Sequence, residues 1–235
     1  MRTILILTLA IFLTKVSTYA QTIEIVSKNK SKFKATNRFE FLNSGIKTSS
    51  STFIATINSK GKDKNSSIPN LFFKIKEKAC DLGANSFKVN KYTKRNSAQE
   101  TILTLDIYRT HDSILEINST GRSKNIFYIF LDDNDPGDSY TFTINDIDRE
   151  IESGTYYRYE VKKGQKVEIG SGGLLGASGN YKWKENNPSV FITLTDFGLP
   201  PDHNEPEYLA RYFNTKRLNT IDPNLGLLLV ELTDD

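Results

Sequence analysis

The segment between Ser67 and Gly83 carries the strongest structural signal in the chain, that of an amphipathic helix. Its apolar residues recur every three or four positions and therefore share one face. They are Ile68, Leu71, Phe72, Ile75, Ala79 and Leu82. Ser67 can cap the start, Pro69 fits the first turn, and Gly83 suits the left-handed residue that ends a helix. A helix with one apolar stripe has to cover another element, so a layered fold is expected.

Strand-like segments flank this helix and are rich in β-branched and aromatic residues. One precedes it at 52–59, and two follow it at 86–92 and 101–109. The order strand, helix, strand, strand predicts a small α+β layer domain over residues 51–118. Residues 21–50 are rich in Ser, Lys and Asn, so we expect a flexible or partly ordered segment with at most one strand, around Phe39–Leu42.

The region 125–235 has a different pattern, with several short apolar or alternating runs separated by turn residues. The expected strands are 125–131, 140–145, 156–161, 166–169, 190–195 and 225–232. This spacing is typical of an antiparallel β-sandwich domain, here with one late helix at about 205–214. The fold class is therefore α+β, and we expect two compact domains, each with its own core.

The first twenty residues have the layout of a secretory signal peptide, with Arg2, an apolar run from Ile4 to Leu13 and small residues up to Ala20. The run is too short to cross a bilayer, and the sequence predicts no transmembrane segment. Removing residues 1–20 leaves 29 basic and 28 acidic residues, so nucleic-acid binding is not expected. The lone Cys80 cannot form an internal disulfide. We therefore expect export to a bacterial periplasm, cell surface or medium.

The segment Ala79–Asn85 resembles the Ala-x-x-Leu-Gly-Ala-Asn signature of small bacterial helix–strand domains. These domains include a heavy-metal-binding family and related envelope stress-sensor lipoproteins. The resemblance implies a helix that packs closely on a sheet and turns into the next strand. Metal binding would need ligands, and this sequence has no His or Cys cluster near the segment, since the nearest histidine is His111.

Residues 125–130 together with 154–167 resemble a second group, the bacterial envelope β-sandwich domains of the carboxypeptidase-regulatory-like kind. The likeness lies in a strand followed by a Gly-x-Tyr strand and a Val-x-x-Gly turn. It implies a non-catalytic binding or structural module and supplies no active site.

An acidic stretch between Leu131 and Ser139 offers a candidate metal site. Its carboxylates could gather around a hard cation such as Ca²⁺. They belong to Asp132, Asp133, Asp135 and Asp138. The spacing does not match an EF-hand, and a solvated hairpin turn built on Pro136 and Gly137 is the alternative.

Two further features are candidate contacts for a ligand or partner. Leu174 and Leu175 interrupt a glycine-rich run at 170–179. The run matches neither the dinucleotide-binding Gly-x-Gly-x-x-Gly pattern nor the Walker pattern. It therefore indicates a loop whose two leucines could insert into a partner. Tyr156, Tyr157 and Trp183 could stack on a glycan or dock a peptide. Because neighbouring strand residues face opposite ways, at least one of the two tyrosines should pack in a core.

The sequence does not predict an enzyme or a cofactor. His111 and His203 each lie beside an acidic residue, yet no Gly-x-Ser-x-Gly elbow occurs. The hypothesis is an exported, non-catalytic protein with a binding, recognition or assembly role, whose partner would be another envelope protein or a glycan. A calcium- or heavy-metal-binding protein is the alternative, and a hydrolase is the third.

Overall fold

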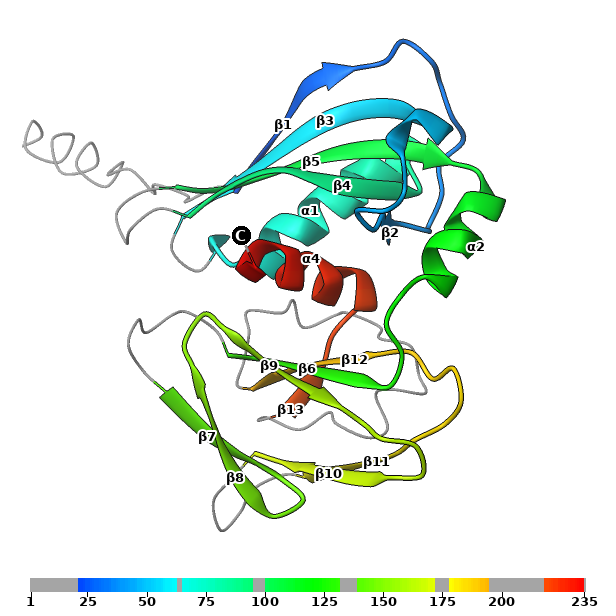
Figure 1. Cartoon of the computed structure of the whole chain (residues 1–235). Helices are drawn as coiled ribbons and strands as arrows, with labels where there is room; N and C mark the ends of the chain where they lie inside the picture. The colour runs from blue at the N-terminus through cyan, green and yellow to red at the C-terminus, as the bar shows by residue number, and fades with distance from the viewer. Residues whose placement is uncertain are drawn as a thin grey trace, which may run out of the picture.

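The computed structural model describes residues 21–62, 65–94, 100–131, 139–171, 178–194 and 218–234. The fold is α+β and rich in strands, as predicted. Figure 1 shows a five-stranded sheet with its helices at one end and two four-stranded sheets at the other. We call the first the α/β layer and the second the paired sheets. Helix α4 (Pro223–Asp234) lies between them.

The sheet of the α/β layer has the strand order β1-β3-β5-β4-β2. Its strands are β1 (Thr22–Lys28), β2 (Glu40–Phe41), β3 (Ser51–Gly61), β4 (Ser86–Thr93) and β5 (Thr101–Thr110). The pair β2–β4 is parallel and the other three pairs are antiparallel. The strands predicted on either side of the helix are confirmed as β3, β4 and β5. The segment 21–50 differs from expectation, because it supplies β1 as well as β2.

Helix α1 (Ile68–Asp81) confirms the helix predicted from the apolar stripe. The Ser67 hydroxyl accepts a hydrogen bond from the Asn70 amide at 3.4 Å and caps the first turn. Gly83 has φ +84°, and a Cβ there would lie 2.5 Å from the Cβ of Phe33. The helix can therefore end only at a glycine. The middle of its stripe, from Leu71 to Ala79, is buried on the sheet, with the Phe72 and Phe87 rings 5.4 Å apart.

The paired sheets have the strand orders β11-β10-β7-β8 and β13-β12-β6-β9. Their strands are β6 (Ile126–Leu131), β7 (Ser139–Ile144), β8 (Ile147–Glu152), β9 (Tyr156–Glu160), β10 (Lys166–Gly170), β11 (Ser178–Lys182), β12 (Val190–Leu194) and β13 (Leu218–Thr220). Both sheets contribute to one apolar cluster, for example Phe127 and Ile192 from one and Phe142 and Val167 from the other. The pair β6–β12 is parallel, whereas all pairs were expected to be antiparallel.

Helix α4 replaces the strand that we predicted at 225–232, and that prediction is wrong. A continuous apolar run fits a buried strand or a buried helix equally well, so periodicity could not distinguish them. Leu225, Leu228 and Leu229 are buried. They belong to the same apolar cluster as Phe72 of α1 and Phe191 on the outer face of β12. The apolar cluster of the α/β layer thus continues through α4 onto the outer face of β6 and β12, while a second apolar cluster fills the space between the paired sheets.

Helix α2 (Asp112–Thr120) was not predicted at all. It follows β5 and begins at His111, whose ring nitrogen accepts a hydrogen bond from the Ser113 amide at 3.3 Å. The late helix expected at 205–214 and the leader at 1–20 lie outside the described residues. Within the described ranges, no helix is long and apolar enough to span a membrane.

Candidate functional site

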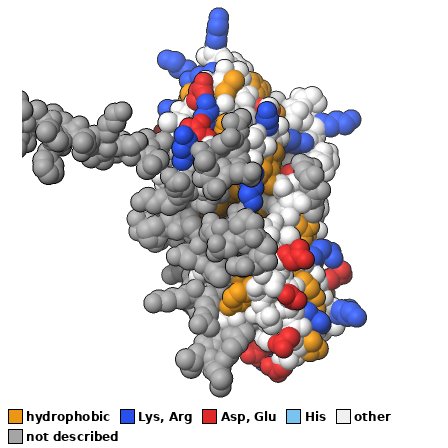
Figure 2. All heavy atoms as spheres, turned by 90° about the vertical axis from the view of Figure 1, so that its left-hand side faces the viewer, with side chains coloured by type: hydrophobic (Ala, Val, Ile, Leu, Met, Phe, Trp, Pro, Cys, Tyr) orange, Lys and Arg blue, Asp and Glu red, His pale blue; other side chains and the backbone are white. Residues whose placement is uncertain are grey.

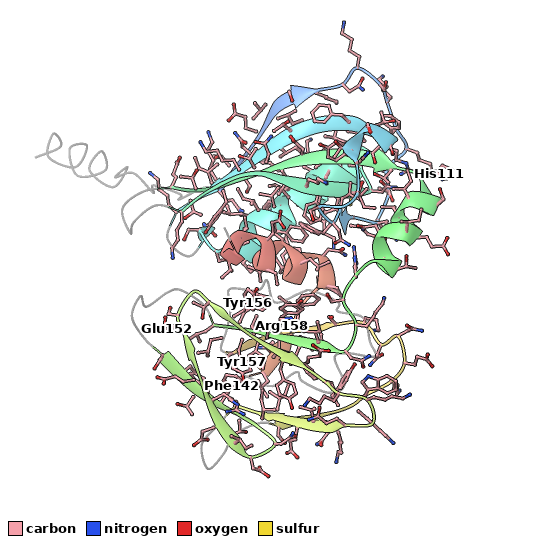
Figure 3. The ribbon with its side chains drawn as sticks, in the orientation of Figure 1. His111, Phe142, Glu152, Tyr156, Tyr157 and Arg158 are labelled. Atoms are coloured by element: carbon pink, nitrogen blue, oxygen red, sulfur yellow. The ribbon has the colours of Figure 1, made fainter. Side chains whose placement is uncertain are left out.

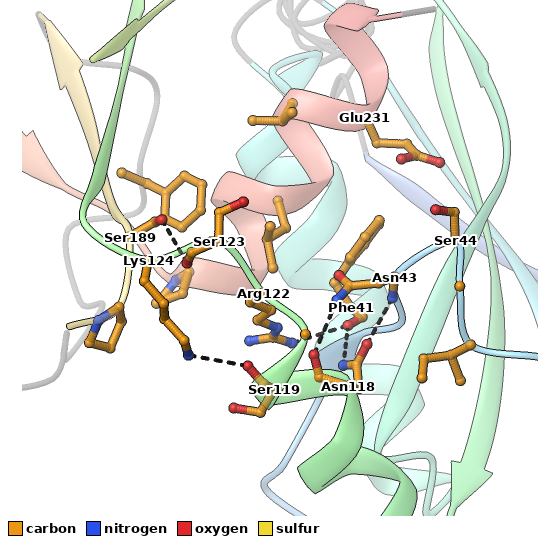
Figure 4. Close-up of a pocket in the computed structure, with 18 of the residues that line it drawn as sticks. Phe41, Asn43, Ser44, Asn118, Ser119, Arg122, Ser123, Lys124, Ser189 and Glu231 are labelled. Carbon is orange, nitrogen blue, oxygen red and sulfur yellow. Dashed lines mark hydrogen bonds between the residues drawn. The ribbon is translucent and has the colours of Figure 1, made fainter. Parts of the chain in front are cut away.

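A cleft of about 710 Å³ lies where the α/β layer, α4 and the paired sheets meet. Five stretches of chain form it (Figure 4): the loop after β2, the end of α2 with the segment that follows, β6, β12 with the residues before it, and the outer turns of α4. The walls are largely apolar and the rim is polar. The apolar wall residues include Ile46, Ile117, Tyr128, Pro188, Leu227 and Val230.

Arg122 holds the floor of this cleft together. Its guanidinium donates hydrogen bonds to the Phe41 carbonyl of β2 and to the Asn224 side-chain oxygen of α4, both at 3.1 Å. The same Asn224 oxygen accepts from the Phe41 amide, also at 3.1 Å. A Glu40 carboxylate oxygen lies 3.5 Å from the Arg122 guanidinium. One arginine therefore joins β2, α4 and the segment that leads into the paired sheets.

The environment of Arg122 is unusual for a cation. Burial lowers the pKa of its guanidinium, while the carboxylates of Glu40 and Asp222 oppose that shift. The Arg122 Nε and the Glu40 Oε2 are buried without a hydrogen-bond partner among the described residues. A half-buried charge held by one carboxylate and two carbonyl-type oxygens positions the backbone around it. We therefore assign Arg122 a structural role beneath the cleft.

Asn118 fixes the opposite wall of the cleft. Its side-chain oxygen accepts from the Asn43 amide at 2.9 Å, and its side-chain nitrogen donates to the Phe41 carbonyl at 2.9 Å. Asn43 completes the pair by donating from its side chain to the Asn118 carbonyl at 3.1 Å. These bonds hold the loop after β2 against α2, so the cleft is preformed rather than assembled on binding.

The exposed groups on the rim are suited to noncovalent contacts. Exposed hydroxyl groups come from Ser44, Ser119 and Ser123, whereas Ser189 is buried and its hydroxyl donates to the Ser123 carbonyl at 2.9 Å. Lys124 supplies an ammonium group, which donates to the Ser119 carbonyl at 3.4 Å, and Glu231 supplies a carboxylate. Among the described residues that line the cleft there is neither histidine nor cysteine. The lining can bury an apolar group and hydrogen-bond a polar one.

A smaller hollow of about 290 Å³ lies at the start of α2 and contains His111. The His111 Nδ1 is 2.9 Å from the Ser113 hydroxyl, which is the distance expected of a serine–histidine pair. However, the same nitrogen caps the helix, and the neighbouring Asp112 carboxylate pairs with Arg38 at 3.0 Å. Catalysis needs a base that is itself oriented by a third group. This histidine is instead engaged with its own helix.

The two predicted tyrosines lie on opposite faces of β9, as the alternation required (Figure 3). Tyr156 packs in the apolar cluster that contains α4, with its ring 5.7 Å from those of Tyr128 and Phe130. Tyr157 faces the interior of the paired sheets, 5.4 Å from the Phe142 ring. Trp183 is half-buried against the same interior cluster. None of Tyr156, Tyr157 and Trp183 lines the large cleft.

The other predicted site residues are not described by the structure. The acidic turn with Asp132, Asp133, Asp135 and Asp138, the pair Leu174 and Leu175, and His203 all lie outside the described ranges. Within those ranges, no group of three or more His, Cys, Asp or Glu residues is placed to hold a metal ion.

The cleft residues themselves were not found from the sequence. They come from positions between 41 and 231 that are far apart in the chain, and they form no motif. One local signal was present, because Asp222 followed by Pro223 is a strong helix start. The Asp222 carboxylate indeed accepts from the Asn224 amide at 2.7 Å.

Comparison with known proteins adds little to this geometry. No protein-family model matches the chain, and no curated protein matches it. Among solved structures, the Francisella virulence factor FvfA aligns with 39% of this chain and 98% of its own, at 11% sequence identity and a TM-score of 0.30. A likeness at that TM-score carries no argument about fold or function.

Proposed function

We propose that this chain is an exported, non-catalytic envelope or secreted protein that recognises a partner or ligand in the large cleft. The observation that carries the proposal is the cleft itself, with a preformed polar floor, apolar walls and a rim of hydroxyl groups. Ligand sites commonly combine a mostly apolar lining with a few fixed polar groups, and they occur where two domains meet.

The proposal includes two domains clamped by α4, with the cleft at their junction. Lys76 of α1 and Asp222 at the start of α4 support this arrangement, because their side chains lie 2.8 Å apart. The partner would be another envelope protein or a glycan. Export rests on the leader-like residues 1–20 alone.

The experiment uses an amphipathic probe, 1-anilinonaphthalene-8-sulfonate, and a variant that fills the cleft. We expect a saturable rise in dye fluorescence with the folded chain, and at least a fivefold weaker affinity for Ser119→Trp. The matched control is Thr141→Trp, at an exposed position of β7 outside the cleft. Its affinity should stay within twofold of the unsubstituted chain.

Native mass spectrometry of the chain purified from its own cells then tests for a bound molecule. We expect a non-covalent adduct that Ser119→Trp removes and Thr141→Trp retains. Equal dye affinity in both variants, together with the absence of an adduct, would contradict the proposal.

A further inference from the structure

Strand β1 is an open edge of the five-stranded sheet. In the described part of the chain its sheet neighbour is β3 alone, so its other side presents unpaired backbone N–H and C=O groups. All seven of its residues are exposed. Ile23, Ile25 and Val26 have exposed fractions of 41%, 36% and 56%. An apolar strand edge of this length is a template for pairing with another chain.

The register of β1 shows which face a new strand would extend. Ile25 lies opposite the buried Ile57, and Ile23 lies opposite the buried Ser59. Directly opposed residues in an antiparallel pair share a face. Ile23 and Ile25 therefore continue the core-facing side of the sheet beyond β3. A sixth strand beside β1 would place alternate side chains next to these two isoleucines.

A run of lysines begins at the last residue of β1 and gives the edge a charged end. Lys28, Lys30, Lys32 and Lys34 are all exposed, and none has a carboxylate within 4 Å among the described residues. Figure 2 shows Lys and Arg side chains beside apolar ones at the end of the molecule where the α/β layer lies. Acidic residues of an incoming segment would be complementary to this end.

A second copy of the chain fits this edge poorly. The two-fold antiparallel register that sets Ile23 against Ile25 of the other copy also sets Glu24 directly against its own counterpart, and like charges in that position are destabilising. A register centred on Ile25 meets the irregularity between Ile25 and Ser27 after a single residue. A segment of a different protein can place an uncharged or basic residue opposite Glu24, and it meets the irregularity of β1 in only one of the two paired strands.

We propose that β1 is a docking edge for an extended segment of a partner protein, paired through its main chain. The segment alternates apolar and polar residues, packs its apolar side chains beside Ile23 and Ile25, and carries carboxylates at the end that lies against Lys28–Lys34. This is strand addition, in which the main chain supplies affinity and side chains supply specificity. The surface is distinct from the cleft, so either can fail without the other.

The test uses two labelled peptides, acetyl-(Thr-Val)₃-Glu₃ and acetyl-Glu₃-(Thr-Val)₃. Each peptide can place its glutamates beside the lysines in only one strand direction, so the pair covers both parallel and antiparallel pairing with β1. The control peptides carry proline in place of the middle valine. Fluorescence anisotropy with the full chain should show saturable binding of at least one probe, and its proline version should bind at least tenfold more weakly. Amide hydrogen exchange should slow in β1 when the probe binds.

Variants of exposed residues then localise the binding. Ile23→Lys/Ile25→Lys should weaken it at least tenfold, whereas Ile147→Lys, at a position 55% exposed on β8, should change it less than twofold. Lys30→Glu/Lys32→Glu should weaken it at low salt and less so at 0.5 M salt, with Lys162→Glu/Lys163→Glu as the charge control. Melting temperatures should match that of the unsubstituted chain, because these side chains are exposed.

Three results would overturn the proposal. One is that neither probe binds better than its proline version. Another is that the edge variants and the control variants behave alike while β1 amides stay unprotected. The third is a concentration-dependent dimer that Ile23→Lys/Ile25→Lys abolishes, which would assign the edge to a second copy.

Discussion

Replacing Gly226 with alanine tests how α4 packs on the paired sheets. A Cβ at Gly226 would lie 2.2 Å from Cγ and 2.3 Å from Cδ1 of the Phe191 ring. Ordinary contact starts near 3.4 Å, so the helix and β12 would have to separate by roughly 1.2 Å. The obstacle is the body of a buried ring that stacks on the Tyr128 ring with 5.1 Å between the centroids, so a shift of Phe191 also disturbs that stack.

The expected cost follows from two opposing effects. Overpacking a well-packed core costs about 1–3 kcal/mol, and an overlap of this size belongs at the upper end. Alanine gains about 1 kcal/mol over glycine in a helix. We therefore expect a net destabilisation of about 2 kcal/mol, which corresponds to a drop of roughly 4–8 °C in melting temperature for a chain of this size.

Urea denaturation and thermal melts followed by circular dichroism measure this change. Gly45→Ala is the matched control, because a Cβ there meets nothing within 4 Å and the change should stay within about 0.5 kcal/mol. In a double-mutant cycle, Phe191→Leu should recover part of the loss caused by Gly226→Ala. If Gly226→Ala were as stable as the unsubstituted chain, the close packing of α4 on β12 would be refuted.

Three further substitutions or reactions test individual contacts. Asp222→Ala removes both the cap of α4 and the partner of Lys76, so urea denaturation should show a free energy of unfolding lower by about 1–2 kcal/mol. Asp222→Asn keeps a capping acceptor, and its free energy of unfolding should fall by less than half as much. Gly83→Ala should cost about 2 kcal/mol or more in the same assay, since φ is +84° and the added Cβ overlaps Phe33; an unchanged midpoint would contradict the helix end described above. Burial raises the pKa of the Cys80 thiol, so iodoacetamide at pH 8 should modify the folded chain at least tenfold more slowly than the chain in 6 M guanidinium; equal rates would refute that shielding.

Local signals in the sequence were enough to predict α1 and the strands β3, β4 and β5. Ser67, Pro69 and Gly83 each occupy the helix position that their backbone chemistry favours. The flanking strands followed from β-branched residues, whose stiffness is a local property. Strand β1 was missed because its short run Ile23 to Val26 is interrupted by Glu24 and lies in a segment rich in Ser, Lys and Asn. It is stabilised by pairing with β3, which is a tertiary effect.

The run 225–232 shows why the rest could not be predicted. Apart from Gly226 and Glu231 its residues are all apolar, because α4 packs against two parts of the molecule, and this removes the periodicity that distinguishes helix from strand. The cleft depends on the same docking. Asn43, Arg122, Ser189 and Glu231 come together only after α4 packs, so no spacing in the sequence could indicate the site.

The position of α4 in the chain has a consequence for folding during synthesis. It comes after every other described element, yet its leucines complete the apolar cluster that begins with Phe39 and Phe41. The early strands and α1 must therefore wait with an uncovered apolar surface until the final described helix has been made. An emerging polypeptide in that condition exposes apolar surface and is prone to aggregate until its closing segment arrives.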